Sequence, residues 1–379
     1  MTATRRQFTT GLLALAANGP AARAATGAEA ATEGLVLPLA ASPRAWDSLT
    51  VSNPRVLRFG PRDFRMWYYG RDAAFDPEIS LPTGRVGLAR SRDGIHWHRV
   101  RGPGPRGTVF DPSTDPAAFD RGHVGVGDVT FESGEYEMWY FGGDDRSGEL
   151  GGAKRRGFPL RIGRARSHDG LHWQRLPGAL RGGAVLDVGA PGEPDAASVG
   201  WPQVIKLRAD LWRMYYHTVG PAVGFAICGA ESTDQGVSWR KLGVLLGRGS
   251  AGRFDVNGAS TRHVFRRGAG FAMLYEGWTH DRRPAIGLAE SRDGLDWQRI
   301  DGPLPDAAVL APPPADTGAW DSGAIGCPCL VEVGDGQSFM YYVAREDARG
   351  GPENDARYQI GLAVSDDPAL LRWRRWRPA

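Results

Sequence analysis

Several features common in other protein classes are scarce in this 379-residue sequence. Three cysteines are too few for the disulfide framework that stabilises small secreted domains. No stretch supplies the ~20 consecutive apolar residues of a membrane-spanning helix, so we expect no membrane span. The 46 basic and 43 acidic residues leave a net charge of +3, which is too small an excess to predict a nucleic-acid partner.

Helical periodicity is also nearly absent, whereas residues typical of strands and turns are abundant. The chain contains 13 Trp, 10 Tyr and 14 Phe, which favour strands, and 53 Gly and 27 Pro, which favour tight turns. Apolar residues make up 41% and charged residues 23%, which excludes a disordered chain and a multi-span membrane protein. The composition therefore predicts an all-β fold of many short strands.

The N-terminal residues resemble a twin-arginine export signal. Residues 4–8 read Thr-Arg-Arg-Gln-Phe, a weakly apolar run covers residues 11–17, and residues 22–24 have the small-x-small pattern of a cleavage site. We therefore expect a signal peptide over residues 1–25 and a single domain over residues 26–379. The signal implies a periplasmic or secreted protein, and the alternative is an Ala-rich tail.

A motif of the form Ser-x-Asp-Gly-x-x-Trp recurs along the chain. An Asp-Gly pair between apolar runs is typical of a β-hairpin, and the Trp would anchor the second strand of that hairpin in the core. Three copies are regular, one is longer and one is degraded. They cover Ser91–Trp97, Ser167–Trp173, Ser291–Trp297, Ser232–Trp239 and Ser365–Trp373.

Each hairpin ends a unit of four predicted strands. A first strand is led in by an Asp, an aromatic strand starting with Met follows, and a short Gly/Ala-rich strand precedes the hairpin turn. The lead aspartates, which we expect to be structural caps of the turn into the first strand, are Asp47, Asp120, Asp195, Asp255 and Asp321. The repeat methionines are Met66, Met138, Met214, Met273 and Met340.

Five such units predict a five-bladed β-propeller with four antiparallel strands per blade. The N-terminal segment Leu35–Ser48 resembles Val309–Ser322, so the two ends of the chain should meet at one seam of the ring. The expected blades cover roughly residues 45–100, 118–176, 194–242, 254–301 and 320–376.

This pattern resembles the propellers of glycoside hydrolase families 32, 43 and 68, over roughly residues 35–376. The resemblance to family 43 implies three acids just before the repeat proline: a base in blade one, a residue that tunes its pKa in blade three, and a general acid in blade four. The matching positions hold Asn53, Trp201 and Thr261, and none of them is acidic. The family triad is therefore missing, which leaves either displaced chemistry or a binding propeller.

A second resemblance concerns the longer hairpin. Ser232–Trp239 matches the Asp-box of sialidase-type propellers, which is a structural hairpin on their outer face. Sialidases have six blades, whereas this sequence predicts five. Convergent turn chemistry therefore accounts for the match, because Asp side chains favour such turns.

Two ionisable residues interrupt a position that is aromatic or apolar in the other blades. Three residues after the repeat Met, three blades have Tyr69, Phe141 and Val343, whereas the others have His217 and Glu276. Trp278 follows Glu276, and a carboxyl group among aromatic rings has the raised pKa of a general acid. The alternative for Glu276 is a structural ion pair with an arginine.

Another position, eight residues after the lead Asp, is polar in four blades and predicts a polar ring near the channel. Asp128 is its one carboxylate. Glycoside hydrolysis needs two carboxyl groups within about 5–10 Å, so Asp128 and Glu276 form a candidate catalytic pair. The alternative for Asp128 is an ion pair with Arg55 of the adjacent blade. The residues at this position are Arg55, Asp128, Gln203, His263 and Cys329.

The remaining candidate residues stand at the ends of the aromatic strands or at further breaks in the repeat, because functional residues gather where strands lead into loops. Cys327 and Cys329 stand two positions apart, which is only a weak signal of a zinc site. A structural role as small buried thiols explains them better. We therefore expect no metal and no cofactor. The predicted substrate-binding residues are Asn53, Arg55, Asp72, His123, Asp144, His217, His263, Trp278, Arg345 and Glu346.

Three functions follow from these observations. The first is a monomeric, exported glycoside hydrolase that acts on a furanosidic or related oligosaccharide through a displaced pair of carboxylates. The second is a non-catalytic propeller that binds a carbohydrate or another small molecule. The third is a sialidase-like enzyme. The number of blades separates the first from the third, and a carboxylate pair facing one pocket separates the first from the second.

Overall fold

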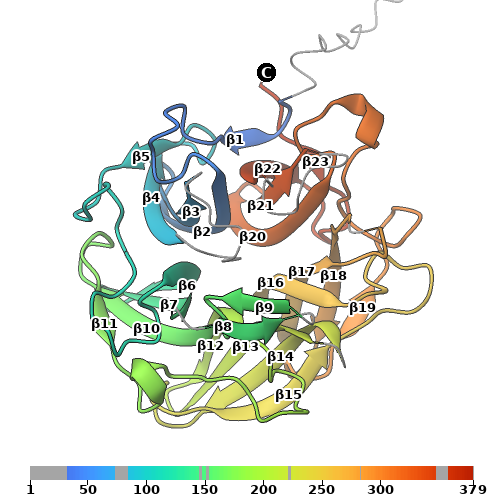
Figure 1. Cartoon of the computed structure of the whole chain (residues 1–379). Coiled ribbons are helices and arrows are strands. Elements are labelled where there is room, and N and C mark those ends of the chain that lie inside the picture. Colours follow the sequence, from blue (N-terminus) through green and yellow to red (C-terminus); the bar gives the residue numbers. More distant parts are fainter. Residues whose placement is uncertain are drawn as a thin grey trace, which may run out of the picture.

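The computed structural model describes residues 32–72, 84–144, 147–150, 153–220, 223–281, 283–346 and 357–378. Five antiparallel sheets lie around a common axis (Figure 1), one for each sequence unit. This arrangement confirms the predicted five-bladed β-propeller and disfavours the six-bladed sialidase architecture. Residues 1–25 lie outside the described residues, so the export signal stays a prediction, as does the monomeric state.

In each blade the first strand lies nearest the axis and the fourth lies at the outer edge (Figure 1). The strands of blade 1 are β2 (Thr50–Gly60), β3 (Asp63–Arg71), β4 (Arg85–Ser91) and β5 (His98–Val100). Those of blade 2 are β6 (His123–Glu132), β7 (Glu135–Gly143), β10 (Arg161–Ser167) and β11 (Gln174–Leu176). Those of blade 3 are β12 (Gly200–Arg208), β13 (Leu211–Gly220), β14 (Gly224–Ser232) and β15 (Arg240–Leu246). Those of blade 4 are β16 (Ala259–Arg267), β17 (Gly270–Gly277), β18 (Ala285–Ser291) and β19 (Gln298–Ile300).

Blade 5 joins the two ends of the chain, as the sequence predicts. Both β1, near the N-terminus, and β23, near the C-terminus, pair with β22, and the N–H of Gly34 donates to the carbonyl of Trp376 at 2.9 Å. This seam closes the ring, which protects the sheet edge from pairing with other chains. The strands are β20 (Ala324–Gly334), β21 (Gln337–Arg345), β22 (Gln359–Ser365), β23 (Arg374–Arg375) and β1 (Leu35–Leu37).

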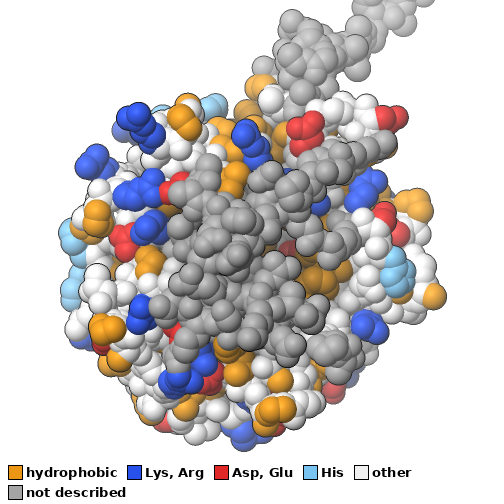
Figure 2. Space-filling model, viewed as in Figure 1, with side chains coloured by type: hydrophobic (Ala, Val, Ile, Leu, Met, Phe, Trp, Pro, Cys, Tyr) orange, Lys and Arg blue, Asp and Glu red, His pale blue; other side chains and the backbone are white. Residues whose placement is uncertain are grey.

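Few elements depart from this plan. A small hairpin of β8 (Ser147–Leu150) and β9 (Ala153–Arg156) is inserted between β7 and β10, and two 3₁₀ turns, η1 (Arg181–Gly183) and η2 (Ala315–Thr317), lie between blades. The described residues contain no helix long and apolar enough to cross a membrane. Around the coloured rim of the face in Figure 2, basic, acidic and apolar side chains are interspersed.

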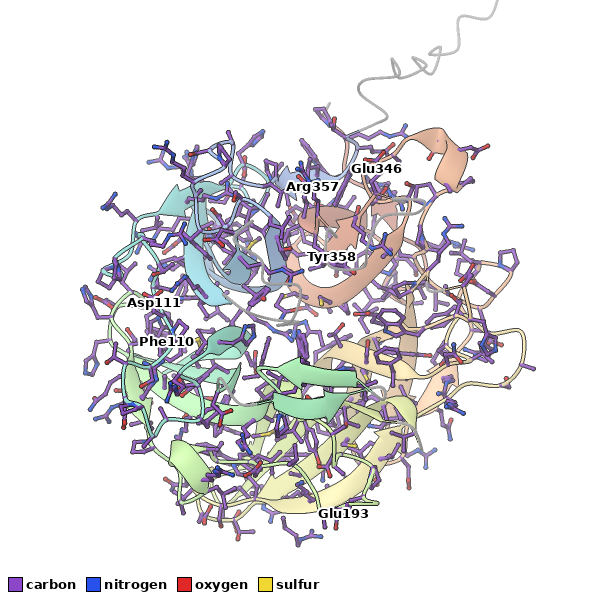
Figure 3. The ribbon with its side chains drawn as sticks, viewed as in Figure 1. Phe110, Asp111, Glu193, Glu346, Arg357 and Tyr358 are labelled. Atoms are coloured by element: carbon purple, nitrogen blue, oxygen red, sulfur yellow. The ribbon has the colours of Figure 1, made fainter. Side chains whose placement is uncertain are left out.

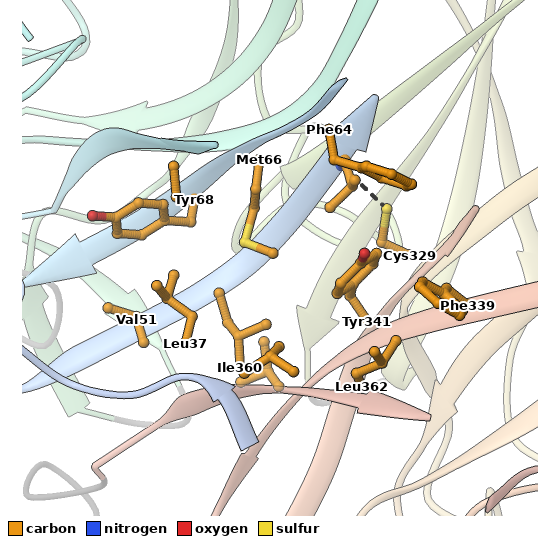
Figure 4. Packing of buried hydrophobic residues seen from close by; sticks show 14 of the residues in the cluster. Leu37, Val51, Phe64, Met66, Tyr68, Cys329, Phe339, Tyr341, Ile360 and Leu362 are labelled. Atoms are coloured by element: carbon orange, nitrogen blue, oxygen red, sulfur yellow. Dashed lines mark hydrogen bonds between the residues drawn. The ribbon is translucent and has the colours of Figure 1, made fainter. Parts of the chain in front are cut away.

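The hydrophobic core lies between the blades, and the repeated residues build it. All five repeat methionines are fully buried. Met66 of blade 1, for example, belongs to one cluster with Tyr341 and Leu362 of blade 5 (Figure 4). Because each blade packs its faces against its neighbours, burial of these side chains stabilises the ring as a whole.

The five lead aspartates are buried, and their carboxylates join strands within a blade. The carboxylate of Asp255 accepts a hydrogen bond from the Tyr275 hydroxyl at 2.9 Å and one from Arg299 Nε at 2.5 Å. It thereby links the second and fourth strands of its blade. Equivalent contacts to a tyrosine, a basic residue or both are made by Asp47, Asp120, Asp195 and Asp321.

The polar position eight residues after each lead Asp connects each blade to the next. The Gln203 amide donates to the carbonyl of Val264 at 2.9 Å and accepts from the N–H of Val264 at 2.8 Å. The same position makes a hydrogen bond to the following first strand in every blade. The other links run from Asp128 to Val204, from His263 to Leu330, from Cys329 to Val56 and from Arg55 to the carbonyl of Gly127.

Candidate functional site

One pocket opens where the inner strands begin, and its volume is about 270 Å³. That is close to the lower end of the range for small-molecule sites, ~300–1,000 Å³. Blades 1, 3, 4 and 5 contribute its walls, and none of the described lining residues comes from blade 2. Tyr358, labelled near the centre of the ring in Figure 3, lies in its wall. The polar and aromatic lining residues include Asn53, Tyr69, Arg71, Trp201, His217, Phe225, Ser260, Thr261, Glu276, Trp278 and Cys327.

Three residues of this lining share an unusual backbone conformation. Asn53, Trp201 and Cys327 stand six residues after their lead Asp, and each has a φ of 48°. Left-handed backbone is uncommon in residues other than glycine and concentrates at functional sites. A shift of strand register accompanies each of them. These bulges change the direction of the three side chains near the start of the inner strands, where the pocket lies.

Glu276, at the end of β17, is the one carboxylate among the described residues that line the pocket. Its Oε2 accepts a hydrogen bond from the Thr261 hydroxyl and another from the N–H of Cys327, the latter at 3.2 Å. Burial raises the pKa of Glu276, and these donors offset part of that rise. Because Thr261 stands at the blade-four position of the family 43 acid, the Glu276 carboxyl group lies beside that position.

Aromatic rings line the pocket around this carboxyl group. Phe225 stacks on Trp278 with ring centroids 4.4 Å apart and planes 14° apart, and His217 extends the stack at 5.8 Å from Phe225. Trp201 meets His217 edge to face at 5.2 Å and stacks on Phe141 at 4.3 Å. The pocket therefore offers aromatic rings together with polar side chains such as Asn53, Thr261 and Glu276.

His217 is an uncharged member of this lining. Burial, together with the positive charge of Arg262, lowers its pKa to about 3. Its Nδ1 is buried and has no hydrogen-bond partner among the described residues. Because an orphaned buried N–H is rarer than an under-satisfied acceptor, we assign the proton to Nε2. His217 and Glu276, the two interruptions of one repeat position, thus lie in the same pocket.

The structure brings together four of the predicted site residues and separates the others. Asn53, His217, Glu276 and Trp278 line the pocket. Arg55, Asp128 and His263 belong instead to the ring of links between blades. The Asp128 carboxylate accepts from the N–H groups of Val129 at 3.0 Å and Val204 at 3.3 Å. We therefore assign Asp128 to that ring, and the predicted pair with Glu276 does not share the pocket.

The remaining predicted residues lie outside the described pocket lining. Asp72 is buried and pairs with Arg106. Arg345 lies over the ring of Tyr358, 5.9 Å from its centroid, and donates to the backbone carbonyl of Glu346, which is exposed. The last two are buried residues of blade 2, His123 and Asp144.

Sequence analysis missed several residues of this site. Phe225 and Tyr69 carry no signal beyond belonging to strands, because every blade has aromatic residues. Arg262 does carry one: it stands where every other blade has proline or glycine. Cys327 also carries one, apart from its weak zinc signal with Cys329. This signal is its repeat position six residues after the lead Asp, which it shares with Asn53 and Trp201.

The two neighbouring cysteines do not share a site. The Cys327 thiol donates to Asn53 Oδ1 at 3.0 Å, whereas the Cys329 sulfur accepts from the N–H of Val56 at 3.4 Å. Among the described residues, no group of three or more His, Cys, Asp or Glu side chains is placed to hold a metal ion. The donor set at the pocket is thus one carboxyl group, one thiol, amide and hydroxyl groups, and an imidazole.

We expect all three thiols to resist alkylation in the folded protein. Burial raises the pKa of Cys327 and of Cys228 to about 12, and it also raises the pKa of Cys329. The thiolate is the reactive form, so iodoacetamide at pH 8 should label none of them in the time that labels free cysteine. If the protein is unfolded in the presence of iodoacetamide, mass spectrometry should find all three cysteines labelled. Rapid native labelling of Cys327 would contradict this expectation.

Comparison with known proteins supports the fold. The structure resembles that of a putative glycoside hydrolase from Parabacteroides distasonis, with a TM-score of 0.61 and 19% identity over 92% of this chain and 96% of that one. It also resembles a thermostable family-43 glycoside hydrolase, with a TM-score of 0.59 and 15% identity over 87% and 94% of the two chains.

A family 117 glycoside hydrolase from Zobellia galactanivorans gives a TM-score of 0.58 and 16% identity over 88% of this chain and 90% of that one. The sequence matches no family model and no curated protein. The structural neighbours confirm the predicted resemblance to propeller glycoside hydrolases, and at these identities the likeness concerns the fold.

Proposed function

We propose that the pocket binds one sugar unit of a carbohydrate and that Glu276 acts as the general acid in hydrolysis of its glycosidic bond. The observation that carries the proposal is a buried carboxyl group with raised pKa, set among aromatic rings at the mouth of this propeller. Such a group holds the proton that a departing sugar oxygen requires. On the strength of the predicted signal, we place this activity in the periplasm or outside the cell.

A carbohydrate-binding pocket without catalysis is the second candidate. It is favoured by the lack of a second carboxylate among the described lining residues, since hydrolysis by the usual route needs two. Asn53 and Trp201 stand where family 43 has two of its acids, and neither can replace a carboxylate as base.

The purified protein should be tested against a broad panel of oligosaccharides, with chromatography for released sugars and calorimetry for binding. Release of sugar supports the hydrolase. Binding without release supports the second candidate. If no carbohydrate is either bound or cleaved, both assignments fail.

Replacing the hydroxyl that contacts Glu276 should move the pH profile. Thr261→Val removes a donor that favours the ionised carboxylate, so the pKa of Glu276 should rise further. Activity that requires the protonated acid is present below this pKa and lost above it, so the high-pH limb of kcat/KM should move to higher pH. Ser52→Ala, which alters another pocket residue, should leave the limb in place. An unchanged limb in Thr261→Val would show that Glu276 is not the titrating acid.

A further inference from the structure

An unexpected arginine lies beneath the floor of the pocket. Arg262 is fully buried and stands seven residues after the lead Asp of blade 4. The blade architecture does not require a charge at this position, since the other blades have a proline or a glycine there. Those residues are Pro54, Gly127, Pro202 and Pro328.

Arg262 is held by backbone carbonyls and not by a carboxylate. Its Nη2 donates to the carbonyls of Trp201 and Tyr215, the latter at 2.6 Å. Its Nε and Nη1 are buried and have no hydrogen-bond partner among the described residues. A guanidinium group stays charged at neutral pH, and a buried charge without a counter-charge is strongly unfavourable.

The neighbouring charged groups do not balance it. Arg55 reaches across the channel, and its Nη2 donates to the backbone carbonyl of Arg262 at 3.2 Å. Asp128 is the carboxylate whose charge acts on Arg262, and it interacts with Arg55 as well. Burial also raises the pKa of Asp128, which weakens it as a counter-charge. Two buried guanidinium groups thus share one carboxylate, and their combined charge is positive.

This positive charge adjoins the pocket directly. Arg262 donates a hydrogen bond to the backbone carbonyl of Trp201, follows Thr261 in the chain and lowers the pKa of His217. All three of these residues line the pocket. Burial raises the pKa of Glu276, which weakens this carboxyl group as a counter-charge. His217 itself is neutral. The described floor of the pocket is therefore electropositive.

We propose that the sugar bound in this pocket carries an anionic group, a carboxylate or a sulfate, whose charge balances Arg262. The inference rests on the proposed carbohydrate-binding function and narrows its ligand class. Arg262 acts through the floor of the pocket as a positioning residue and does not touch the ligand. The neutral furanose units implied by the resemblance to family 43 would leave the buried charge unbalanced.

Calorimetry with matched sugars tests this proposal. The pairs are D-glucuronate against D-glucose and D-galacturonate against D-galactose, and galactose 6-sulfate distinguishes a sulfate from a carboxylate. If the anionic group binds about 10 Å from the guanidinium, at an effective dielectric constant of about 20, the preference for the anionic sugar should be on the order of tenfold. Because Arg262 is buried, the preference should persist in high salt better than that of a surface pair would.

Variants locate the source of the preference. Arg262→Met should reduce the ratio of acidic to neutral affinity to about one, whereas Arg262→Lys should retain it. Arg267→Met is the matched control on the same strand, since Arg267 pairs with Glu290 at 2.9 Å and is far from the pocket lining. If Arg262→Met does not fold, Arg262→Gln takes its place, and equal binding of acidic and neutral sugars by the unmodified protein overturns the inference in either case.

Each outcome is decisive. Tighter binding of the anionic sugars that depends on a positive charge at residue 262 supports the inference. Equal binding of acidic and neutral sugars overturns the inference but not the proposed function. The same holds if Arg262→Met keeps the preference for anionic sugars. Failure to bind or cleave any sugar overturns the proposed function and this inference with it.

Discussion

Glu276→Gln should reduce glycoside hydrolysis by about 10²–10⁴-fold, the usual contribution of a general acid. Glutamine keeps the size of the side chain and can still contact the Thr261 hydroxyl, but it cannot give up a proton to the leaving oxygen. The loss should appear in kcat, with sugar binding largely retained. Initial rates and calorimetry on the same preparation would measure both.

The stability of this variant provides its own control. Because the folded protein raises the pKa of Glu276, the stabilising form is the neutral one. Its contribution is fully present below the unfolded pKa of about 4.3 and is lost as pH rises through the folded pKa. At pH 7, Glu276→Gln should therefore unfold at the same temperature as the unmodified protein or higher. Glu346→Gln, which alters an exposed carboxylate, should keep full activity. Full activity in Glu276→Gln would remove Glu276 from the mechanism.

Asp255→Ala should lower the free energy of unfolding by about 3–5 kcal/mol, as expected when one partner of a buried charged pair is removed. Asp255 has no exposed surface, and its loss leaves the Tyr275 hydroxyl and the Arg299 guanidinium without their common acceptor. The same contact recurs around the ring, so one substitution tests a feature of all five blades. Urea unfolding followed by tryptophan fluorescence would measure the change.

A nearby ion pair supplies the matched comparison. Asp301 pairs with Arg253 of the same blade, but its side chain is 75% exposed. Asp301→Ala should cost only about 0–1 kcal/mol, since exposed pairs contribute little. Similar losses in the two variants would mean that the lead aspartates do not act as buried bridges.

The polar position that contains Asp128 shows how much of the structure can be predicted from a single sequence. Its polar character in four blades was visible in the repeat and indicated a polar ring near the channel. The partner of each side chain was not visible, because it lies on the first strand of the next blade. Asp128 therefore looked like half of a catalytic pair, whereas its carboxylate accepts from Val204 in blade 3.

The sequence predicts only some of the residues that line the pocket. Glu276 and His217 were found because they interrupt a repeated position, and Asn53 because it stands where a family acid is missing. Phe225 could not be found in this way, since aromatic residues occur in every blade and only contact with Trp278 distinguishes it.

The sequence by itself determined the number of blades, the order of their strands and the seam that closes the ring. It could do so because residues with the same structural role recur at the same position in every unit. Comparing the five units therefore identifies these residues without an alignment of homologues. Only the tertiary structure decided which unrepeated side chains share a site. Closure of the ring brings Asn53 within 3.0 Å of Cys327, a residue 274 positions away. It also leaves the charge of Arg262 buried beneath them, because neighbouring inner strands converge there and exclude the solvent that would otherwise balance it.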